Sequence, residues 1–599
     1  MRVGRASSQP ARAPGFRPDS VWTERRARVA ETPIDTVVRE DQPCGVNSDG
    51  ATFLRTDPER FRAETDDPAP ASRVPPPPEP GATADGTAVV EFTGARGGVA
   101  PLTWGQSSIW RLTTWRADGD SYFNMPWTLP VYGRRDLDTV LGALRRLLER
   151  HETLRTNFRR TPGGMVQHVT REGRLTVQVV DGGHARPLTA ARELAAGLAA
   201  AAFDYEAELP VRCAVVTIGG RPRAVAFGLS HLAADGGALG LLAADWRDLL
   251  AGNDPPEPTW QPMDQAAFER EGPGAVRGER AVRYWQAVLE KAPAFMFDYP
   301  RHPSGEPRFI RILMRSVALG AAAETLAARW SVSTASVLTT ASAVLLSTLT
   351  GHRRIAMQLI GANRHDPRIG ALVGPAAQDG IFMLELPGGT LAEATRIGHR
   401  QALTAYRHAH YEPLGLMAMR EEVGRRRGGP IDLSAYFNDT RGGGDWPDLP
   451  ALEQPGDPAA IAALTGRTTF APAGSWDHVD ATTVQFIIGP ARETCELHLL
   501  ADTAYLPRTT VHTLLRGMET LLVSAVAEDV PLDAVAGLCD ITPVDRPPGW
   551  ERSQTGPAGE TAEASDPART GADRVHGETA ETTETPETSG SVVAEAIGG

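Results

Sequence analysis

The stretch of sequence that decides the fold is Ala224-Val225-Ala226-Phe227-Gly228-Leu229-Ser230-His231-Leu232-Ala233-Ala234-Asp235-Gly236. Its first six residues are a short apolar run, which predicts a buried strand. The apolar residues that follow recur at helical spacing, at Leu239, Leu242, Trp246 and Leu249. A buried strand, a short loop and a helix in succession indicate an α/β fold. In such folds catalytic side chains emerge where strands end, so His231 is the first candidate for chemistry.

His231 suits general-base chemistry because the unperturbed pKa of histidine, about 6.5, lies close to neutral pH. A single histidine at a strand end also has a purely structural interpretation. Asp235 and Gly236 fit a tight turn that would fix the loop carrying His231. Successive strand residues point to opposite faces, so Ser230 and His231 should not share a site. The sequence also contains no GxSxG elbow, which argues against a serine nucleophile.

Strand and helix signals alternate on both sides of this stretch. Apolar residues at helical spacing predict a helix around Leu137 to Leu148. The other predicted elements are a strand at 89–92, a helix at 334–349, a strand at 355–360 and a helix at 507–526. This α/β body is too long for one ordinary domain, so we expect two lobes, at residues 88–275 and 276–545.

The two ends of the chain differ from this body in composition. Residues 1–87 have little periodic apolar pattern and close on a proline run at 75–80, which favours an extended conformation. Residues 546–599 hold ten acidic residues and four arginines, so they contribute a net charge of 4 − 10 = −6 to the total of −13. We expect both ends to be largely disordered, because neither segment can bury a core.

Charge and composition exclude several classes of function. A net charge of −13 argues against a nucleic-acid partner, which would require clustered Lys and Arg. No apolar run approaches the roughly 18 residues of a membrane span, and no signal peptide is visible, so we expect a cytoplasmic protein without a membrane partner. The four cysteines are far apart, and the spacing of His408, His410 and His478 does not suit metal binding. We expect no bound metal or cofactor, and structural or surface roles for these three histidines.

Four blocks of sequence occur in a fixed order that points to one family. They are Thr103 to Trp110, which we expect to form a strand, Arg150 to Phe158, the Ser230 to Gly236 segment, and Tyr284-Trp285. In this order they resemble the signature motifs of nonribosomal peptide synthetase condensation domains. The second block, Arg-His-Glu-Thr-Leu-Arg-Thr-Asn-Phe, matches the RHExLRTxF motif of that family at every fixed position. The segments 361–364 and 411–413 stand where looser family motifs would be expected.

The resemblance implies a fold of two chloramphenicol-acetyltransferase-like lobes, arranged as a V-shaped pseudo-dimer with a central tunnel. It implies an acyltransferase that forms an amide or ester bond in nonribosomal peptide or related natural-product biosynthesis. Donor and acceptor would each arrive on the phosphopantetheine arm of a carrier protein. The sequence has no visible adenylation or carrier signature, so we expect a free-standing monomer that meets its carrier proteins in trans.

The resemblance also assigns roles to single residues. The His231 segment is similar to the HHxxxDG motif, whose second His is catalytic, so His231 would help to deprotonate or position the attacking group. Asp235 would be structural and paired with an arginine, for which we expect Arg155, because a buried carboxylate needs a paired charge. Gly236 completes the motif. A different interpretation of Arg155 is that it only covers a helix end.

Two departures from the family pattern keep alternatives open. Ser230 stands where the first His of the motif would be, and residues 369–379 lack the usual GxFVNT sequence, which helps to form the bridge between lobes. A condensation enzyme that tolerates Ser230 is one interpretation. A catalytically inactive recruitment module that docks a tailoring enzyme is the second, and an O-acyltransferase of the same fold is the third.

Overall fold

The computed structural model describes residues 84–114, 121, 123–386, 388–441, 446–454, 456–479 and 481–545. The prediction of disorder for residues 546–599 lies outside the described residues, as does the prediction for residues 1–83. The first described element, β1 (Ala84–Thr93), begins inside the segment expected to be an extension.

The first lobe is built on a five-stranded sheet in the order β1-β6-β7-β8-β3. Two helices, α3 (Leu137–Arg150) and α5 (Gly236–Ala251), share one core with this sheet, and α4 (Pro187–Ala199) packs on β7 and β8 from a second core. A small sheet, β2-β5-β4, lies beside it. The strands are β2 (Gly98–Pro101), β3 (Asn124–Pro130), β4 (Thr156–Thr161), β5 (Gly164–Val169), β6 (Glu172–Asp181), β7 (Val211–Ile218) and β8 (Arg221–Ser230).

The second lobe is built on a seven-stranded sheet in the order β11-β10-β12-β14-β15-β9-β13. Its largest core joins this sheet to α8 (Val317–Trp330), α9 (Thr334–Thr350), α11 (Leu391–Arg407) and α14 (Arg508–Ala527). The strands are β9 (Phe309–Ser316), β10 (Arg354–Gly361), β11 (Gln378–Glu385), β12 (Ala435–Asp439), β13 (Thr469–Trp476), β14 (Val484–Ile488) and β15 (Cys495–Asp502). Shorter helices are α10 (Pro367–Gly370), α13 (Pro458–Ala463) and α15 (Val535–Leu538).

The elements predicted from apolar periodicity are present. The predicted helix around Leu137 to Leu148 is α3, which begins where the Asp136 side chain accepts a hydrogen bond from the Thr139 amide, 2.8 Å away. The predicted buried strand before His231 is β8, and the helix after it is α5. The predicted elements at 334–349, 355–360 and 507–526 are α9, β10 and α14. The local pattern was sufficient here because α3, α5 and α14 bury an apolar face at helical spacing, while β8, β10 and α9 are continuous buried runs.

The prediction of a strand from Thr103 to Trp110 is wrong, because this segment forms α2 (Trp104–Thr114). Thr103 and Gln106 cap the helix reciprocally. The Gln106 amide donates to the Thr103 hydroxyl at 3.1 Å, and the Thr103 amide donates to the Gln106 side chain at 2.8 Å. This capping box satisfies two backbone donors that a helix start would otherwise leave open.

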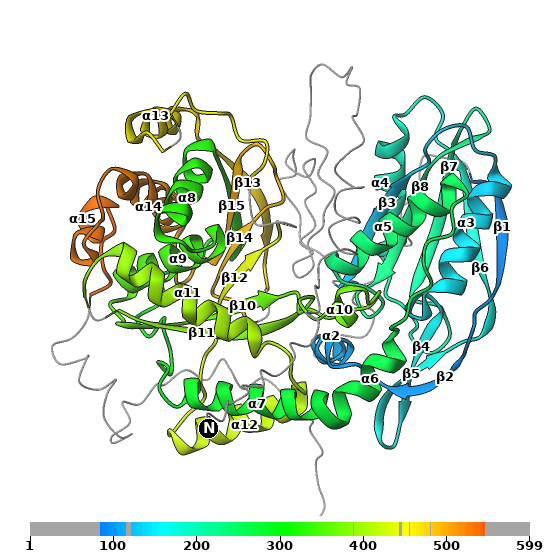
Figure 1. Cartoon of the computed structure of the whole chain (residues 1–599), viewed down its shortest axis with the longest axis horizontal. Coiled ribbons are helices and arrows are strands. Elements are labelled where there is room, and N and C mark those ends of the chain that lie inside the picture. The colour runs from blue at the N-terminus through cyan, green and yellow to red at the C-terminus, as the bar shows by residue number, and fades with distance from the viewer. Residues whose placement is uncertain are drawn as a thin grey trace, which may run out of the picture.

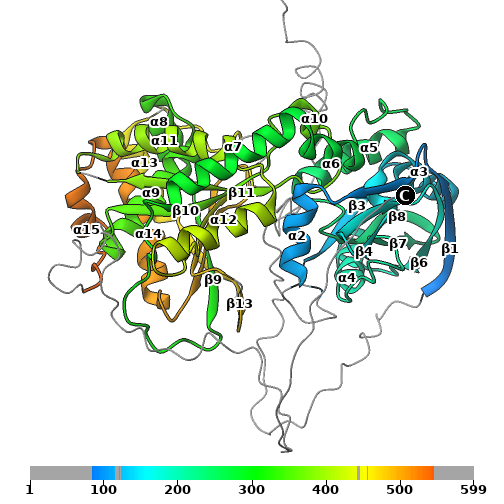
Figure 2. The ribbon, with the colours of Figure 1, turned by 90° about the horizontal axis from the view of Figure 1, so that it is seen from below.

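Helices cross between the two lobes (Figures 1 and 2). α6 (Pro262–Arg270) lies beside the first lobe, and α7 (Gly272–Leu289) continues along the second lobe, where it packs with α12 (Pro413–Arg426). The expected lobe boundary at 275/276 therefore falls inside α7. Val373 of the second lobe lies in the core of the first. The lobes are thus joined by packed residues as well as by the chain.

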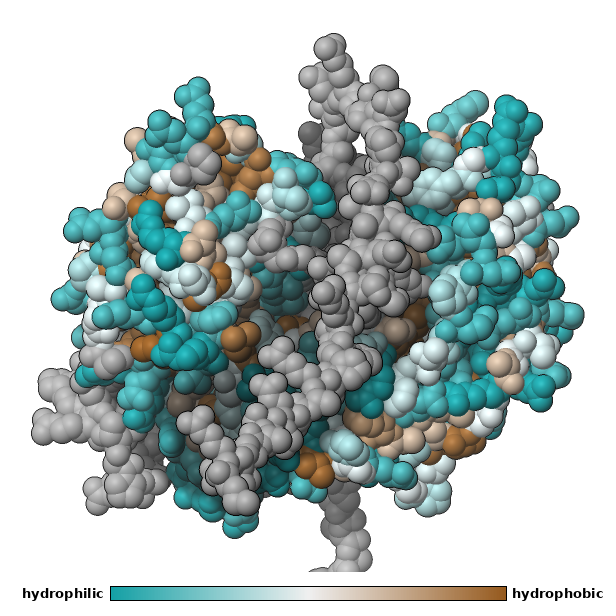
Figure 3. Space-filling model, viewed as in Figure 1, coloured by the Kyte–Doolittle hydropathy of each residue, from teal (hydrophilic) through white to brown (hydrophobic). Residues whose placement is uncertain are grey.

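The outer faces of both lobes are mainly hydrophilic in the view of Figure 3. Among the described residues, no single helix is both long and apolar enough to cross a membrane. The helices α8 and α9 meet that criterion only as a pair, and the pair is bent by 105°.

Candidate active site

His231 lies directly after β8, in the loop that leads to α5. Its backbone amide donates to the carbonyl of Phe123, and its ring Nδ1 lies 2.8 Å from the carbonyl oxygen of Ala234. A carbonyl can only accept, so Nδ1 carries the proton and the lone pair of the neutral ring is on Nε2. The loop therefore fixes both the orientation and the tautomer of the imidazole that a general base requires.

The surroundings of His231 favour its neutral form. Burial is the largest influence and lowers the pKa of His231 below its usual value, while the nearby charge of Asp235 and the Ala234 carbonyl oppose that shift. The side chain is almost fully buried. At neutral pH the imidazole is consequently unprotonated, which is the state that accepts a proton.

Asp235 anchors the loop at several points. Its Oδ1 caps α5 by accepting from the Ala238 amide at 2.8 Å. Its Oδ2 accepts from the amides of Ala376 and Ala377, at 2.8 and 3.1 Å, and these residues belong to the second lobe. Burial alone would raise the pKa of Asp235, but the charge of Arg364 and these amide donors outweigh it and hold the pKa below its usual value. Asp235 is therefore an ionised structural anchor.

The predicted pairing of Asp235 with Arg155 is wrong, because Asp235 forms its ion pair with Arg364. Arg155 instead donates to the backbone carbonyls of Arg96 and Thr170, at 2.7 and 2.8 Å, at the edge of the small sheet. Arg155 ends the short 3₁₀ helix η1 (Glu152–Arg155), next to β4. It therefore ties together the segments that flank the small sheet and does not reach the His231 loop.

Arg364 is held in place by the segment that departs from the family motif. Its guanidinium donates to the carbonyls of Ile369, Leu372 and Gly374 at 2.8 to 3.1 Å. A Cβ atom on Gly237 would lie 2.1 Å from Arg364 Nε, so the first turn of α5 needs glycine there for the ion pair to form. The neighbouring Gly236 of the predicted motif is the first residue of α5 and is buried.

Ser230 has different partners from His231. Its side chain is buried, and its hydroxyl accepts from the Leu232 amide at 3.2 Å and lies 3.5 Å from the hydroxyl of Tyr205. These contacts shape the start of the loop. They give Ser230 a structural place in the turn.

The Arg150 to Phe158 block contacts both the His231 loop and α5. Thr153 donates its hydroxyl to the carbonyl of Ala233, 2.6 Å away, inside the His231 loop. Arg150 Nε and His151 Nε2 both contact Asp245 of α5, at 2.9 and 3.0 Å. The predicted motif is therefore structural support for the loop, although sequence alone did not identify Ala233 and Asp245 as its partners.

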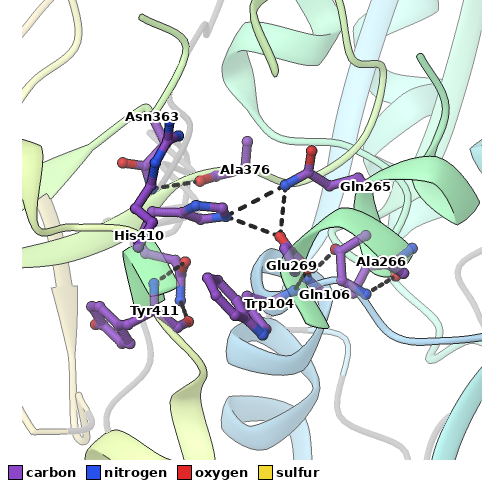
Figure 4. Close-up of polar contacts among 12 residues, drawn as sticks. Trp104, Gln106, Gln265, Ala266, Glu269, Asn363, Ala376, His410 and Tyr411 are labelled. Carbon is purple, nitrogen blue, oxygen red and sulfur yellow. Dashed lines mark hydrogen bonds and ion pairs between the residues drawn. The ribbon is translucent and has the colours of Figure 1, made fainter. Parts of the chain in front are cut away.

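A second buried polar cluster lies where the lobes meet (Figure 4). His410, expected to be structural or exposed, is buried, and its Nε2 lies 2.9 Å from Glu269 Oε1. Gln265 donates to the same carboxylate at 2.8 Å, and the amide of Trp104 donates to it at 2.7 Å. Sequence reasoning missed Glu269 and Gln265. The capping box of α2 was the one signal that could have placed Trp104 at a helix start.

The described residues contain no group of three or more His, Cys, Asp or Glu side chains that could hold a metal ion. Cys213, Cys495 and Cys539 are buried free thiols, and burial raises the pKa of each. Their thiolate forms are disfavoured, so none is suited to nucleophilic chemistry. The expectation that the chain binds no metal or cofactor remains a prediction.

Comparison with known proteins finds one matching family model and several similar synthetases. The family model described as condensation domain matches residues 97–418. Surfactin synthase subunit 2 of Bacillus subtilis is 26% identical over 316 residues, which is 52% of this chain and 9% of that protein. A probable non-canonical nonribosomal peptide synthetase, CymA of Salinispora arenicola, is 27% identical over 52% of this chain and 4% of its own length. The chain thus spans only a small part of these relatives.

Solved structures show the same fold. The condensation domain of the monacolin K polyketide synthase MokA is 18% identical, with a TM-score of 0.55 over 73% of this chain and 99% of that one. The X-domain from teicoplanin biosynthesis is 17% identical, with a TM-score of 0.53 over 73% of this chain and 98% of that one. The predicted α/β fold with chloramphenicol-acetyltransferase-like lobes is confirmed, while the V shape and the tunnel remain predictions. Because the family model matches residues 97–418, which is more than half of the chain, the chain belongs to the condensation domain family.

Proposed function

We propose that the chain is a free-standing acyltransferase that joins a carrier-bound acyl or aminoacyl donor to an amine or hydroxyl acceptor. Carrier proteins would present the substrates in trans to a monomeric, cytoplasmic enzyme. The observation that carries the proposal is the state of His231. It is neutral, its Nδ1–H is held by the Ala234 carbonyl, and its loop is anchored by Asp235. This tautomer leaves the lone pair on Nε2, where a general base would accept a proton.

In the proposed reaction His231 acts as a general base. The acceptor nitrogen attacks the thioester carbonyl of the donor, and Nε2 accepts a proton from that nitrogen as the carbon–nitrogen bond forms. The carbon–sulfur bond then breaks, and the leaving pantetheine thiolate takes the proton back from the imidazolium. The products are an amide on the acceptor and a free thiol on the donor carrier. A hydroxyl acceptor would give an ester by the same steps.

A recruitment module is the second candidate, and two observations favour it. Ser230 replaces the first histidine of the motif, and Gly374-Pro375 stands in the altered bridge. One structure with a TM-score of 0.53 is a complex of the teicoplanin X-domain with OxyB, so the same fold can dock another protein. The retained His231, Asp235 and Arg364 geometry supports the enzyme instead.

An O-acyltransferase is the third candidate. The solved structure of SgcC5 from Streptomyces globisporus, with a TM-score of 0.52, contains a naphthyl ethanediol, which is a diol ligand. A protein with this fold can therefore bind a molecule that carries hydroxyl groups. The mass of the product would show whether the acceptor group is an amine or a hydroxyl.

The deciding experiment mixes the purified chain with the carrier proteins encoded beside its gene, each loaded with its substrate. Intact-protein mass spectrometry then follows the mass of the acceptor carrier. Transfer of the acyl mass to an amine or hydroxyl, lost in His231→Ala, supports the proposal. Acyl transfer to a hydroxyl with free or coenzyme A-linked substrates, without carrier proteins, would support the O-acyltransferase. Absence of any transfer, together with tight binding of a tailoring enzyme, would establish the recruitment module.

A further inference from the structure

Glu269 and His410 form a pair that is buried between the two lobes. Glu269 lies on α6 and His410 precedes α12, and the exposed fractions of the two residues are 1% and 5%. One carboxylate accepts three hydrogen bonds here, from His410, Gln265 and the Trp104 amide. Three donors fix the position of this buried carboxylate, and the loss of one of them would leave a buried acceptor site unsatisfied.

One side of this pair leads to the residues that anchor Asp235 (Figure 4). Ala409, the neighbour of His410, accepts from the side-chain amide of Asn363 at 2.8 Å. The same amide donates to the carbonyl of Ala376 at 2.9 Å. The amide of Ala376 in turn donates to Asp235, at 2.8 Å. Hydrogen bonds through Asn363, together with the backbone of Ala409 and of Ala376, therefore connect His410 with Asp235 of the His231 loop.

The other side of the pair reaches the same segment through α2. Glu269 holds the amide of Trp104, and the next residue, Gly105, lies so close to Pro375 that a Cβ atom there would be 2.1 Å from the Pro375 carbonyl oxygen. The ring of Trp104 also packs against His410, with ring centroids 4.8 Å apart. Residues 375–376 are thus contacted from two directions, by Asn363 and by Gly105, and each of these is linked to a neighbour of the Glu269–His410 pair.

We propose that Glu269 and His410 are positioning residues for the active site, because together they hold residues 375–377 against Asp235 and thereby fix the His231 loop. Neither residue is placed at the reacting atoms. The expected effect of Glu269 and His410 on turnover rests on the proposed condensation function. Their expected effect on the position of residues 375–377 is independent of that function. The two parts can therefore be tested separately.

The chain offers matched variants for the test. His410→Leu removes the donor to Glu269, while His410→Gln keeps an N–H that can donate to the same carboxylate. Glu269→Gln keeps the volume and removes the charge, which provides a second route should His410→Leu fail to fold. His352→Leu is the control, since His352 is equally buried in the second lobe and lies 3.1 Å from Asp298, outside the path to Asp235.

The first measurement is hydrogen–deuterium exchange of the full chain without substrate, resolved to the amides of Ala376 and Ala377. We expect exchange of these amides to rise at least about tenfold in His410→Leu and Glu269→Gln, to return toward wild type in His410→Gln, and not to change in His352→Leu. An increase confined to Trp104 and α6 would show a purely local structural role and overturn the proposal.

The second measurement is turnover with loaded carrier proteins. His410→Leu should lower kcat roughly tenfold, with carrier affinity unchanged and with recovery in His410→Gln. Normal kcat in a His410→Leu enzyme whose Ala376 amide exchanges rapidly would overturn the positioning role. A wild-type chain without turnover would contradict the proposed condensation function, and the exchange measurement would still decide whether the pair holds residues 375–377.

Discussion

Asp235 of the first lobe and Arg364 of the second form a buried ion pair beside His231. The Asp235 side chain is 2% exposed and that of Arg364 is 15% exposed, so solvent does little to screen their interaction. The same carboxylate also caps α5 and accepts two amides of the bridge segment. One side chain therefore links the start of α5, the His231 loop and the second lobe.

Removal of this carboxylate should destabilise the fold. In Asp235→Ala the guanidinium of Arg364 stays buried without its partner, which should lower the free energy of unfolding by about 3 to 5 kcal/mol. Urea unfolding followed by circular dichroism measures the difference. Glu193→Ala, at an exposed position of α4, is the control and should stay within about 0.5 kcal/mol of wild type. An unchanged unfolding free energy for Asp235→Ala would contradict the structural role.

Two glycines of α5 provide a matched pair of substitutions. In Gly237→Ala the new methyl group would lie 2.1 Å from Arg364 Nε, whereas a Cβ on Gly240 meets no atom within 4 Å. We expect Gly237→Ala to destabilise by about 1 to 3 kcal/mol. Gly240→Ala should stabilise by about 0.5 to 1 kcal/mol, because alanine loses less backbone entropy in a helix. Thermal unfolding of both variants would show opposite shifts in Tm, and equal shifts would refute the assigned contact.

Much of the fold could be predicted from local patterns, but the pairings between distant segments could not. α3 and α5 each bury one apolar face and β8 is a continuous buried apolar run, and both patterns are visible in the sequence. Asp235 and Arg364 are 129 residues apart, and no local rule favours Arg364 over Arg155. The Glu269–His410 pair spans 141 residues and two lobes. These contacts depend on how the lobes pack, which periodicity does not encode.

The α2 segment shows why a local signal can also be misjudged. Its aromatic and β-branched residues, such as Trp104 and Ile109, are favoured in strands. The Thr103–Gln106 capping box and the acceptance of the Trp104 amide by Glu269 outweigh that preference. The capping box can be read from the local sequence. The acceptor for the Trp104 amide cannot, because Glu269 lies 165 residues away.

The pH dependence of turnover should reflect the buried state of His231. Burial lowers the pKa of His231 below its usual value of 6.5, so the ring stays unprotonated further into the acid range. A base that must be unprotonated then keeps its activity as pH falls through 6.5, and the acid limb of kcat/KM should have its midpoint below that pH. Rates between pH 5 and 8, with a saturating donor carrier, would measure the limb.

The control for this profile is His231→Gln, whose residual rate should lack the same limb because glutamine does not titrate. An acid limb at or above pH 6.5 in the wild type would contradict a buried, neutral base. A limb that persists unchanged in His231→Gln would assign the titration to another group.

Substitutions at Ser230 and His231 should separate chemistry from loop structure. His231→Ala removes the group that takes the proton, so turnover should fall roughly a hundredfold to ten-thousandfold while carrier binding stays near normal. Ser230→Ala removes only the contacts with the Leu232 amide and Tyr205, so its loss of turnover should be far smaller. Product formation by mass spectrometry and carrier affinity by calorimetry would be measured for each variant, with unfolding curves to show that both are folded. Wild-type turnover in His231→Ala would end the general-base assignment. Equal losses in the two variants would mean that the loop geometry, and not the imidazole, limits the reaction.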